Sequence, residues 1–158
     1  MMIFVVGFLS LVLGGVVGGL YAVRRMARIV DQAEAKAMHN LQFAHAMVQW
    51  VHIKQQSKSL ATALEKRGYR KIAVYGMADV GERFISELQS STVEVSYGID
   101  QNAKNLFAEI ELFTPDEKLP EVDAIIVTPI QYFDAIEEML TQKVDYPVLS
   151  VEDLMYEV

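Results

Sequence analysis

The residues with the clearest chemical potential form a short turn between an apolar run and an amphipathic segment. The turn is Gly76-Met-Ala-Asp-Val-Gly81, a G-x-A-x-x-G pattern that follows KIAVYG (71–76) and opens DVGERFISELQ (79–89). In the dinucleotide-binding fingerprint, the first glycine allows a tight turn and the last lets a helix pack closely on a sheet. Asp100 comes 24 residues after Gly76, at the end of the next apolar run, where an acidic side chain can bind ribose hydroxyls. The spacing therefore predicts a nucleotide site.

The same turn carries features that oppose phosphate binding. Ala78 places a methyl group where the fingerprint has its middle glycine, and so where a pyrophosphate would approach the backbone. Asp79 and Glu82 are spaced to cap the helix reciprocally, and their charges would offset the attraction of the helix N-terminus for anions. The turn contains no Lys or Arg, the nearest being Arg83. The alternative is a fold that keeps its glycines for packing alone and binds no ligand.

The elements that position this turn follow from the alternation of short apolar runs and amphipathic segments after Tyr69. Apolar runs bounded by turn residues predict strands, and apolar residues at three- and four-residue spacing predict helices. A short helix after the N-cap candidate Ser59 would end at Gly68. We expect strands at 71–76, 93–100, 108–113, 122–130 and 147–151, helices at 79–89 and 132–142, and a final turn at 152–158. Residues 58–158 are thus predicted to form a small α/β domain of Rossmann-like type, with a parallel sheet flanked by helices on both faces.

The start of the chain predicts a membrane anchor. Residues 3–23 carry no charge, and as a helix they would span about 32 Å, close to the ~30 Å hydrocarbon core of a bilayer. We expect residues 1–23 to form one transmembrane helix rather than a cleaved signal peptide, because no basic side chain precedes the run and no small-x-small cleavage site follows it. Arg24, Arg25 and Arg28 come directly afterwards, so positive-inside bias predicts an outside N-terminus and a cytoplasmic C-terminal domain. In a bacterium, such a single-pass protein would lie in the inner (plasma) membrane.

Small residues within this apolar run indicate helix association. Gly14, Gly15, Gly18 and Gly19 form two overlapping small-xxx-small pairs, a spacing that lets two helix backbones approach closely. Besides the lipid bilayer, we therefore expect a second copy of the chain or another membrane protein as a partner.

Residues 24–57 predict a long membrane-proximal amphipathic helix, since no glycine or proline lies between Leu20 and Arg67. Two apolar stripes run along it. A 4-3-4-3 seam could form a coiled coil, and a second stripe widens the apolar face beyond a two-stranded seam. We therefore expect this helix to pack against a twin, the chain's own C-terminal domain or the bilayer surface. The seam is Ala37, Leu41, Ala44, Val48 and Val51, and the second stripe is Phe43, Met47 and Trp50. His39, His45 and His52 also lie here, and we interpret them as ordinary interfacial residues rather than metal ligands.

Composition and charge narrow the function classes. The chain has 158 residues, about one domain, and its lack of cysteine excludes disulfides, thiolate metal sites and a cysteine nucleophile. The formal net charge is −7, but residues 1–70 carry +6 and residues 71–158 carry −13. A C-terminal domain so acidic is not expected to bind nucleic acid.

The segments RKIAVYGMADVGERFISEL, VSYGID and VDAIIVTPI together resemble the small Rossmann-type domains of bacterial polysaccharide-biosynthesis clusters. These are similar to the N-terminal domains of sugar acetyltransferases and to nucleoside-diphosphate-sugar epimerase-like proteins. The resemblance covers roughly residues 60–155 and implies NAD(P) or a nucleotide-sugar as the ligand and glycan-assembly proteins as partners. The cofactor-binding residues that motif and resemblance together predict are Gly76, Met77, Ala78, Asp79, Val80, Gly81, Asp100, Thr128 and Pro129.

The sequence disfavours catalysis by this chain alone. Short-chain enzymes of the epimerase group use a Tyr-xxx-Lys pair, and no tyrosine here has a lysine four residues later. About 90 residues suffice only for a nucleotide-binding half, and every histidine lies before it. We therefore expect a membrane-anchored, non-catalytic, nucleotide- or sugar-nucleotide-binding module in surface-polysaccharide biosynthesis at the cytoplasmic face. The alternatives are an accessory subunit of a sugar-nucleotide-modifying enzyme and a purely structural membrane oligomer.

Overall fold

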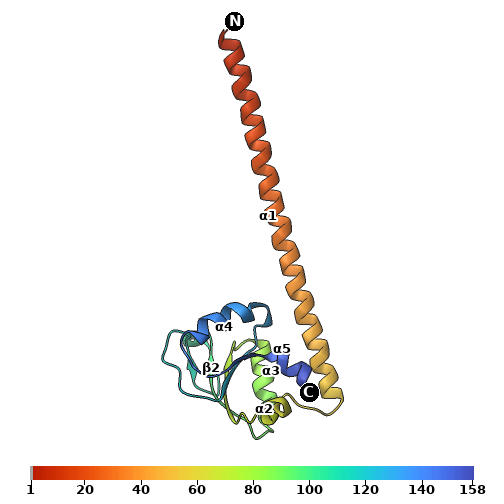
Figure 1. Cartoon of the computed structure of the whole chain (residues 1–158), viewed down its shortest axis with the longest axis vertical. Coiled ribbons are helices and arrows are strands. Elements are labelled where there is room, and N and C mark those ends of the chain that lie inside the picture. The colour runs from red at the N-terminus through yellow and green to blue at the C-terminus, as the bar shows by residue number, and fades with distance from the viewer. Residues whose placement is uncertain (1) are drawn as a thin grey trace. The chain divides into compact units, whose positions relative to one another are not determined.

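A single helix, α1 (Met2–Gln55), precedes all other elements of the chain (Figure 1). The computed structural model describes residues 2–158, and the side-chain surroundings from Gly19 onward except those of Leu20, Ala22 and His39. The chain divides into two compact units, residues 1–42 and 43–158. The last turns of α1 therefore belong to the same unit as the sheet.

The first unit consists of helix α1 up to Gln42. Every side chain described in it is exposed, among them large apolar ones at Tyr21, Val23, Met26 and Leu41. Within the part of the chain whose side chains are described, no helix is both long enough and apolar enough to cross a membrane. Most of the predicted span 3–23, including Gly14, Gly15 and Gly18, lies outside that part, as does the side chain of His39. Gly19 is described, and a Cβ atom added there would meet open space.

The second unit is built on a five-stranded, fully parallel sheet, which confirms the predicted α/β class. The strand order is β3-β2-β1-β4-β5, with β1 at the centre. The central strands are buried almost throughout, as expected for apolar runs covered on both faces. The strands are β1 (Lys71–Tyr75), β2 (Glu94–Ile99), β3 (Leu112–Phe113), β4 (Ala124–Val127) and β5 (Val148–Ser150).

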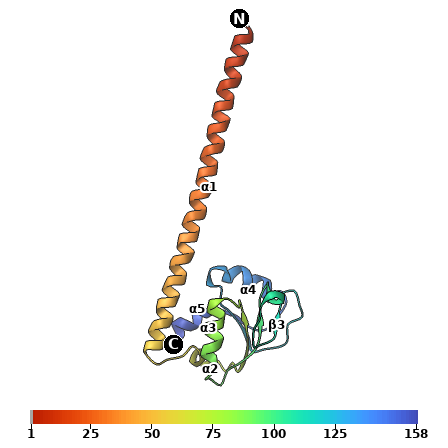
Figure 2. The same cartoon turned by 180° about the vertical axis from the view of Figure 1, so that it is seen from behind.

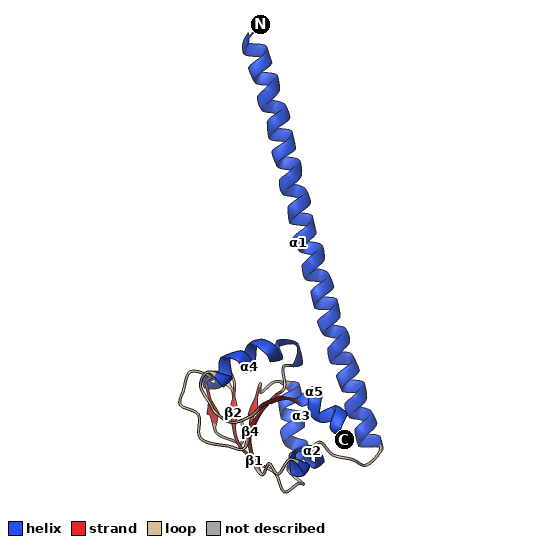
Figure 3. Cartoon of the chain, in the orientation of Figure 1, coloured by secondary structure: helices blue, strands red, loops and turns tan. Residues whose placement is uncertain are grey.

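Helices cover both faces of this sheet, as the alternating pattern predicts (Figure 3). Figures 1 and 2 show α2, α3 and α5 together on one side of the sheet and α4 on the other. Each face has its own apolar cluster, built around Ile72, Val74 and Phe84 on one side and Ala73, Ile125 and Leu140 on the other. The helices are α2 (Ala61–Lys66), α3 (Asp79–Leu88), α4 (Phe133–Thr141) and α5 (Val151–Glu157), with single 3₁₀ turns η1 (Ala103–Asn105) and η2 (Ile130–Tyr132).

The predicted elements are present, but several begin or end at other residues than predicted. The run 122–130 forms a strand only to Val127. The N–H of Thr128 donates to the carbonyl oxygen of Tyr75 at the end of β1, and Pro129 has no N–H with which to continue the ladder of hydrogen bonds. The final segment is a helix rather than a turn. Ser150 Oγ caps it by accepting the N–H of Glu152 at 3.2 Å, and the helix buries the side chain of Leu154. Around α2, Ser59 Oγ accepts the N–H of Ala61 at 3.2 Å, and Gly68 has the left-handed φ of +81° that follows the helix end.

The reciprocal cap predicted for Asp79 and Glu82 is wrong. The N-cap of α3 is Ala78, which has extended backbone angles and no side-chain acceptor, so Asp79 is already the first helical residue. Both acids nevertheless lie in the first turn, where their charges complement the helix dipole.

The C-terminal end of α1 packs against the domain, which is one of the three possibilities left open for this helix. Trp50 of the second stripe is buried with Ala46 and Ile53 in the same cluster as α2, α3 and α5, and Met47 packs beside it, whereas Phe43 remains exposed. Val48 and Val51, from the coiled-coil seam, remain exposed on the other side of the helix. The link to α2 then reverses the chain at Ser57, a non-glycine residue with a φ of +57°.

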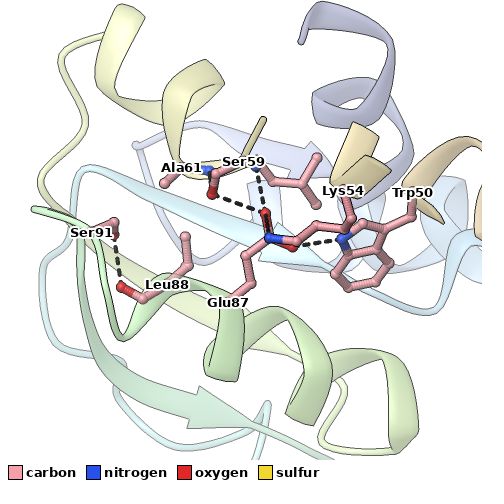
Figure 4. A network of polar contacts seen from close by, with 8 residues as sticks. Trp50, Lys54, Ser59, Ala61, Glu87, Leu88 and Ser91 are labelled. Carbon is pink, nitrogen blue, oxygen red and sulfur yellow. Dashed lines mark hydrogen bonds and ion pairs between the residues drawn. The ribbon is translucent and has the colours of Figure 1, made fainter. Parts of the chain in front are cut away.

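A nearly buried carboxylate joins these segments (Figure 4). The side chain of Glu87 on α3 is only 5 % exposed. Its Oε2 accepts the indole N–H of Trp50 at 2.6 Å, and its Oε1 accepts the Ser59 hydroxyl at 2.9 Å and the Leu60 N–H at 2.8 Å. The Lys54 ammonium lies 3.5 Å from Oε1. One acceptor thus holds α1, the start of α2 and α3 together.

We predict that Glu87→Gln lowers the free energy of unfolding by about 3 kcal/mol, because the new amide N–H₂ must face either the indole or the Ser59–Leu60 donors. The emission of Trp50, the single tryptophan, reports both unfolding and this contact. Glu82→Gln, on the exposed side of the same helix, is the matched control and should change stability by less than about 0.5 kcal/mol. Equal effects of the two substitutions would contradict the role of Glu87.

A second prediction concerns acid stability. Asp123 Oδ2 accepts the backbone N–H groups of Arg70 and Lys71 at 2.7 and 2.8 Å, and these hydrogen bonds hold its pKa below the usual 3.8. A lowered folded-state pKa contributes stability above the unfolded value, and this contribution is lost as the pH falls through the folded value. Asp123→Asn should therefore be less stable than the parent near neutral pH, and the difference should shrink below about pH 3.8 in urea unfolding series. A difference that stays constant down to pH 2 would refute this assignment.

Candidate functional site

The candidate site lies where the strand order reverses. The chain runs from β1 to β2 on one side and later to β4 on the other side of β1. In open parallel sheets, ligands bind in the crevice beyond the carboxyl ends of the strands at such a switch point. Gly76 follows β1, and Thr128 and Pro129 follow β4, so the predicted turn borders this crevice.

The crevice contains a hollow of about 500 Å³, within the size range of small-molecule sites. Strand ends provide its polar side, and one face of α4 provides its apolar side. The lining residues are Tyr75, Gly76, Asp100, Gln101, Pro129, Tyr132, Ala135, Ile136 and Met139.

Gly76 and Gly81 are both required by close packing of the turn. Gly76 has a φ of +92°, and a Cβ atom there would lie 2.7 Å from the ring of Pro129. A Cβ atom on Gly81 would lie 2.0 Å from the carbonyl oxygen of Gly76, which is backbone and cannot move aside cheaply. The glycines of the fingerprint therefore have a structural explanation in addition to any ligand.

Thr128 fastens the turn to the neighbouring strand. Its side chain is 4 % exposed, and its hydroxyl lies 3.0 Å from the carbonyl oxygen of Tyr75 and 2.9 Å from that of Gly76. Its backbone N–H also donates to Tyr75 O at 3.0 Å. Thr128 therefore holds the end of β1 in place and does not line the hollow.

Asp100 reaches the predicted turn through its carboxylate. Its Oδ2 accepts the N–H of Met77 at 2.9 Å, and its Oδ1 accepts the N–H of Asn102 at 2.8 Å. The N–H of Gly76 donates to the carbonyl oxygen of Ile99 at 2.8 Å. The first two amides of the turn thus have partners within the protein, and a phosphate would have to compete with Asp100 for Met77.

The charges around the start of α3 are predominantly negative. Asp79 and Glu82 lie in its first turn, Asp100 adds a third carboxylate at the turn, and the exposed Arg83 is the nearest cation in sequence. Ala78, at the N-cap, is exposed. This field disfavours a pyrophosphate at the helix N-terminus, as the composition of the turn predicts.

The structure divides the nine predicted residues into four groups. Gly76, Asp100 and Pro129 line the hollow together. Gly81, Val80 and Thr128 serve packing, whereas Ala78 and Asp79 are exposed at the helix start. The buried Met77 faces away from this hollow, with its sulfur close to Gly98.

Sequence reasoning missed most of the apolar wall. Ile136 and Met139 follow Tyr132 at helical spacing, but that spacing alone does not show which face of α4 reaches the crevice. Tyr75 and Gln101 share a hydrogen bond at the polar side, and burial raises the pKa of the Tyr75 phenol. Tyr75 therefore stays neutral at physiological pH and keeps a polar hydroxyl at the hollow.

We predict that Gly81→Ala destabilises the domain by about 3 kcal/mol, because the added methyl group overlaps the Gly76 carbonyl. Urea unfolding followed by Trp50 emission measures the loss. Arg83→Ala, an exposed change in the same turn, is the control and should cost no more than about 0.5 kcal/mol. Parental stability of Gly81→Ala would show that the turn is not packed as described.

Comparisons with known proteins add no family assignment. No protein-family profile matches the chain, and no curated protein matches its sequence. The likeness to small domains of polysaccharide-biosynthesis proteins therefore remains an expectation from the sequence.

Proposed function

We propose that the chain is a membrane-anchored, non-catalytic module that binds a nucleotide or nucleotide-sugar in the crevice between β1 and β4. The observation that carries this proposal is the hollow of about 500 Å³ at the switch point, with Gly76, Asp100 and Pro129 on its wall. Fold, position and residue types agree there, since a parallel sheet of this strand order binds nucleotides at the same edge.

The two sides of the hollow suit the two parts of a nucleoside. Ile136, Met139 and Pro129 offer apolar contacts for the flat face of a base. Asp100 offers carboxylate oxygens to the ribose hydroxyls, which would replace the amide of Met77 as hydrogen-bond donors. The phosphates would extend toward solvent, because the acidic start of α3 does not favour them.

The membrane and pathway parts of the proposal come from the sequence. The uncharged run 3–23 followed by Arg24, Arg25 and Arg28 supports a single-pass anchor with the domain in the cytoplasm. The likeness of residues 60–155 to polysaccharide-cluster domains supports a role in surface-glycan assembly. A module in this position would bind a nucleotide and thereby influence a membrane-bound glycan-assembly complex, without catalysing a reaction.

The test is thermal unfolding of the full chain in detergent micelles with NAD, NADP or a UDP-sugar. A ligand present at about 100 times its dissociation constant should add about 2.7 kcal/mol to the stability of the domain. Asp100→Ala should weaken binding of that ligand about tenfold, equal to about 1.4 kcal/mol. Asp145→Ala, an exposed loop position, is the control with the same change in charge.

Three results would argue against the proposal. Stability unchanged by all these ligands would exclude binding of the compounds the fold is expected to take. Equal affinity of the Asp100 and Asp145 variants would remove the ribose contact. Turnover of the ligand when membrane partners are added would favour the accessory-enzyme alternative.

A module that binds no ligand is the second candidate, and a specific observation favours it. Asp100 already satisfies Met77 and Asn102, and packing alone accounts for Gly76 and Gly81. In that case Asp100→Ala would lower the stability of the unliganded domain and have no effect on any ligand.

A further inference from the structure

A second hollow lies away from the crevice, on the α3 face of the sheet edge. Its volume is about 510 Å³, and it lies between α3, β2 and the segment that leads to β3. Its wall is largely apolar. The apolar residues that line it include Met77, Ile85, Leu88, Val93, Val95, Leu106, Ile110 and Leu112.

The charged residues that line this hollow are all acidic. Glu82 contributes from α3, Glu94 from β2 and Glu109 from the segment before β3, and all three are exposed. No lysine or arginine is among the lining residues that the structure describes. Lys71 is the register partner of Glu94, and Arg83 adjoins Glu82 in sequence, but neither reaches the lining.

Two of these glutamates are free to meet an external partner. Within the described chain, neither Glu82 nor Glu109 has a side-chain hydrogen bond or ion pair, in contrast to Glu87 on the inner side of the same helix. Their negative charges are therefore uncompensated locally, and they add to the −13 of residues 71–158.

An aromatic side chain stands beside the hollow in full contact with solvent. Phe107 is completely exposed although it belongs to the lining, and Leu106 and Ile110 flank it at half-buried positions. Exposed apolar residues gathered at a hollow with a polar rim are typical of interaction sites.

We propose that this hollow is a docking site for a cationic, amphipathic peptide segment of a partner protein. The apolar wall would receive two or three aliphatic or aromatic side chains, for which a volume of about 510 Å³ is sufficient. Lysine or arginine residues between them would lie against Glu82, Glu94 and Glu109. The proposal is independent of nucleotide binding, because the two hollows share no lining residue.

Charge decides between this occupant and the others. A second copy of the domain on the same face would bring the three glutamates against their counterparts, which like-charge repulsion opposes. A fatty-acyl anion would meet the same repulsion. A positively charged segment gains from every charge on the rim.

The experiment measures fluorescence anisotropy of a labelled peptide, Lys-Leu-Lys-Phe-Leu-Lys, with the full chain in phosphatidylcholine nanodiscs, which carry no net lipid charge. Binding should weaken with added salt. Glu82→Gln combined with Glu109→Gln should weaken it about fivefold at low ionic strength. The matched control is Asp134→Asn with Glu138→Gln, which makes the same charge change on exposed positions of α4 and should have little effect.

A second variant tests the hollow itself. Ser86→Trp places an indole in the lining and should reduce binding by more than about tenfold, while Gln142→Trp at the exposed end of α4 should not. Unchanged thermal unfolding of Ser86→Trp shows that the domain is intact.

Each contrary outcome would overturn the proposal. Equal binding of the peptide Glu-Leu-Glu-Phe-Leu-Glu would show that charge does not select the occupant. Binding that Ser86→Trp leaves intact would place the peptide elsewhere. If the peptide does not bind, but a neutral apolar dye does, and Ser86→Trp abolishes dye binding while the glutamate substitutions leave it unchanged, the hollow is a site for small apolar molecules. Self-association through this face in place of peptide binding would identify a second copy as the occupant.

Discussion

The domain depends on a carboxylate that is surrounded by donors. Glu87 accepts hydrogen bonds from the Trp50 indole, the Ser59 hydroxyl and the Leu60 amide, and Lys54 lies nearby. These groups belong to α1 and to the link that leads into α2, whereas Glu87 itself belongs to α3. A nearly buried acidic side chain is stable only if it is fully paired, so the three segments hold one another in place. Since α3 also begins at the glycine turn, the junction and the candidate site are the two ends of one helix.

The residues of that turn both pack the start of α3 against the sheet and border the candidate site. Gly81 lets α3 approach the carbonyl of Gly76, and Thr128 fixes the end of β1 to the end of β4. The same packing opens a hollow on the α4 side, with Asp100 at its edge. The glycines of the turn therefore have a packing role, and the proposed binding of a nucleotide requires Asp100 to exchange the Met77 amide for a ribose hydroxyl.

The sheet could be predicted because its signals are local. Ala124–Val127 is apolar at every position, as a strand covered on both faces requires, and Gly76 marks the end of β1. Features set by tertiary contacts could not be predicted. The segment after Ser150 is short and acidic, yet it forms a helix because Ser150 caps it and Leu154 and Met155 reach the core. Periodicity shows that the end of α1 has an apolar stripe but not what covers it, and here the cover is the chain's own domain.

The residues of the candidate site likewise fall into some that could be predicted from the sequence and others that could not. Gly76 and Asp100 were predictable because motif spacing and parallel topology bring strand ends to one edge, and Pro129 was expected from the resemblance to Rossmann-type domains. Ile136 and Met139 were not, because the face that α4 turns toward the crevice is fixed by packing on the sheet. The acidic hollow next to Leu106 and Phe107 depends on how an irregular segment folds back on α3, and no sequence pattern specifies such a contact.

The reversal at Ser57 has a consequence for how the domain is held. A serine at a φ of +57° occupies a conformation that costs of order 1 kcal/mol, so the bend persists only because its neighbours impose it. Glycine at position 57 would allow many backbone conformations, and so many directions for the chain after α1. Serine permits few, so the link between the last turn of α1 and the start of α2, both within the sheet unit, has little conformational freedom.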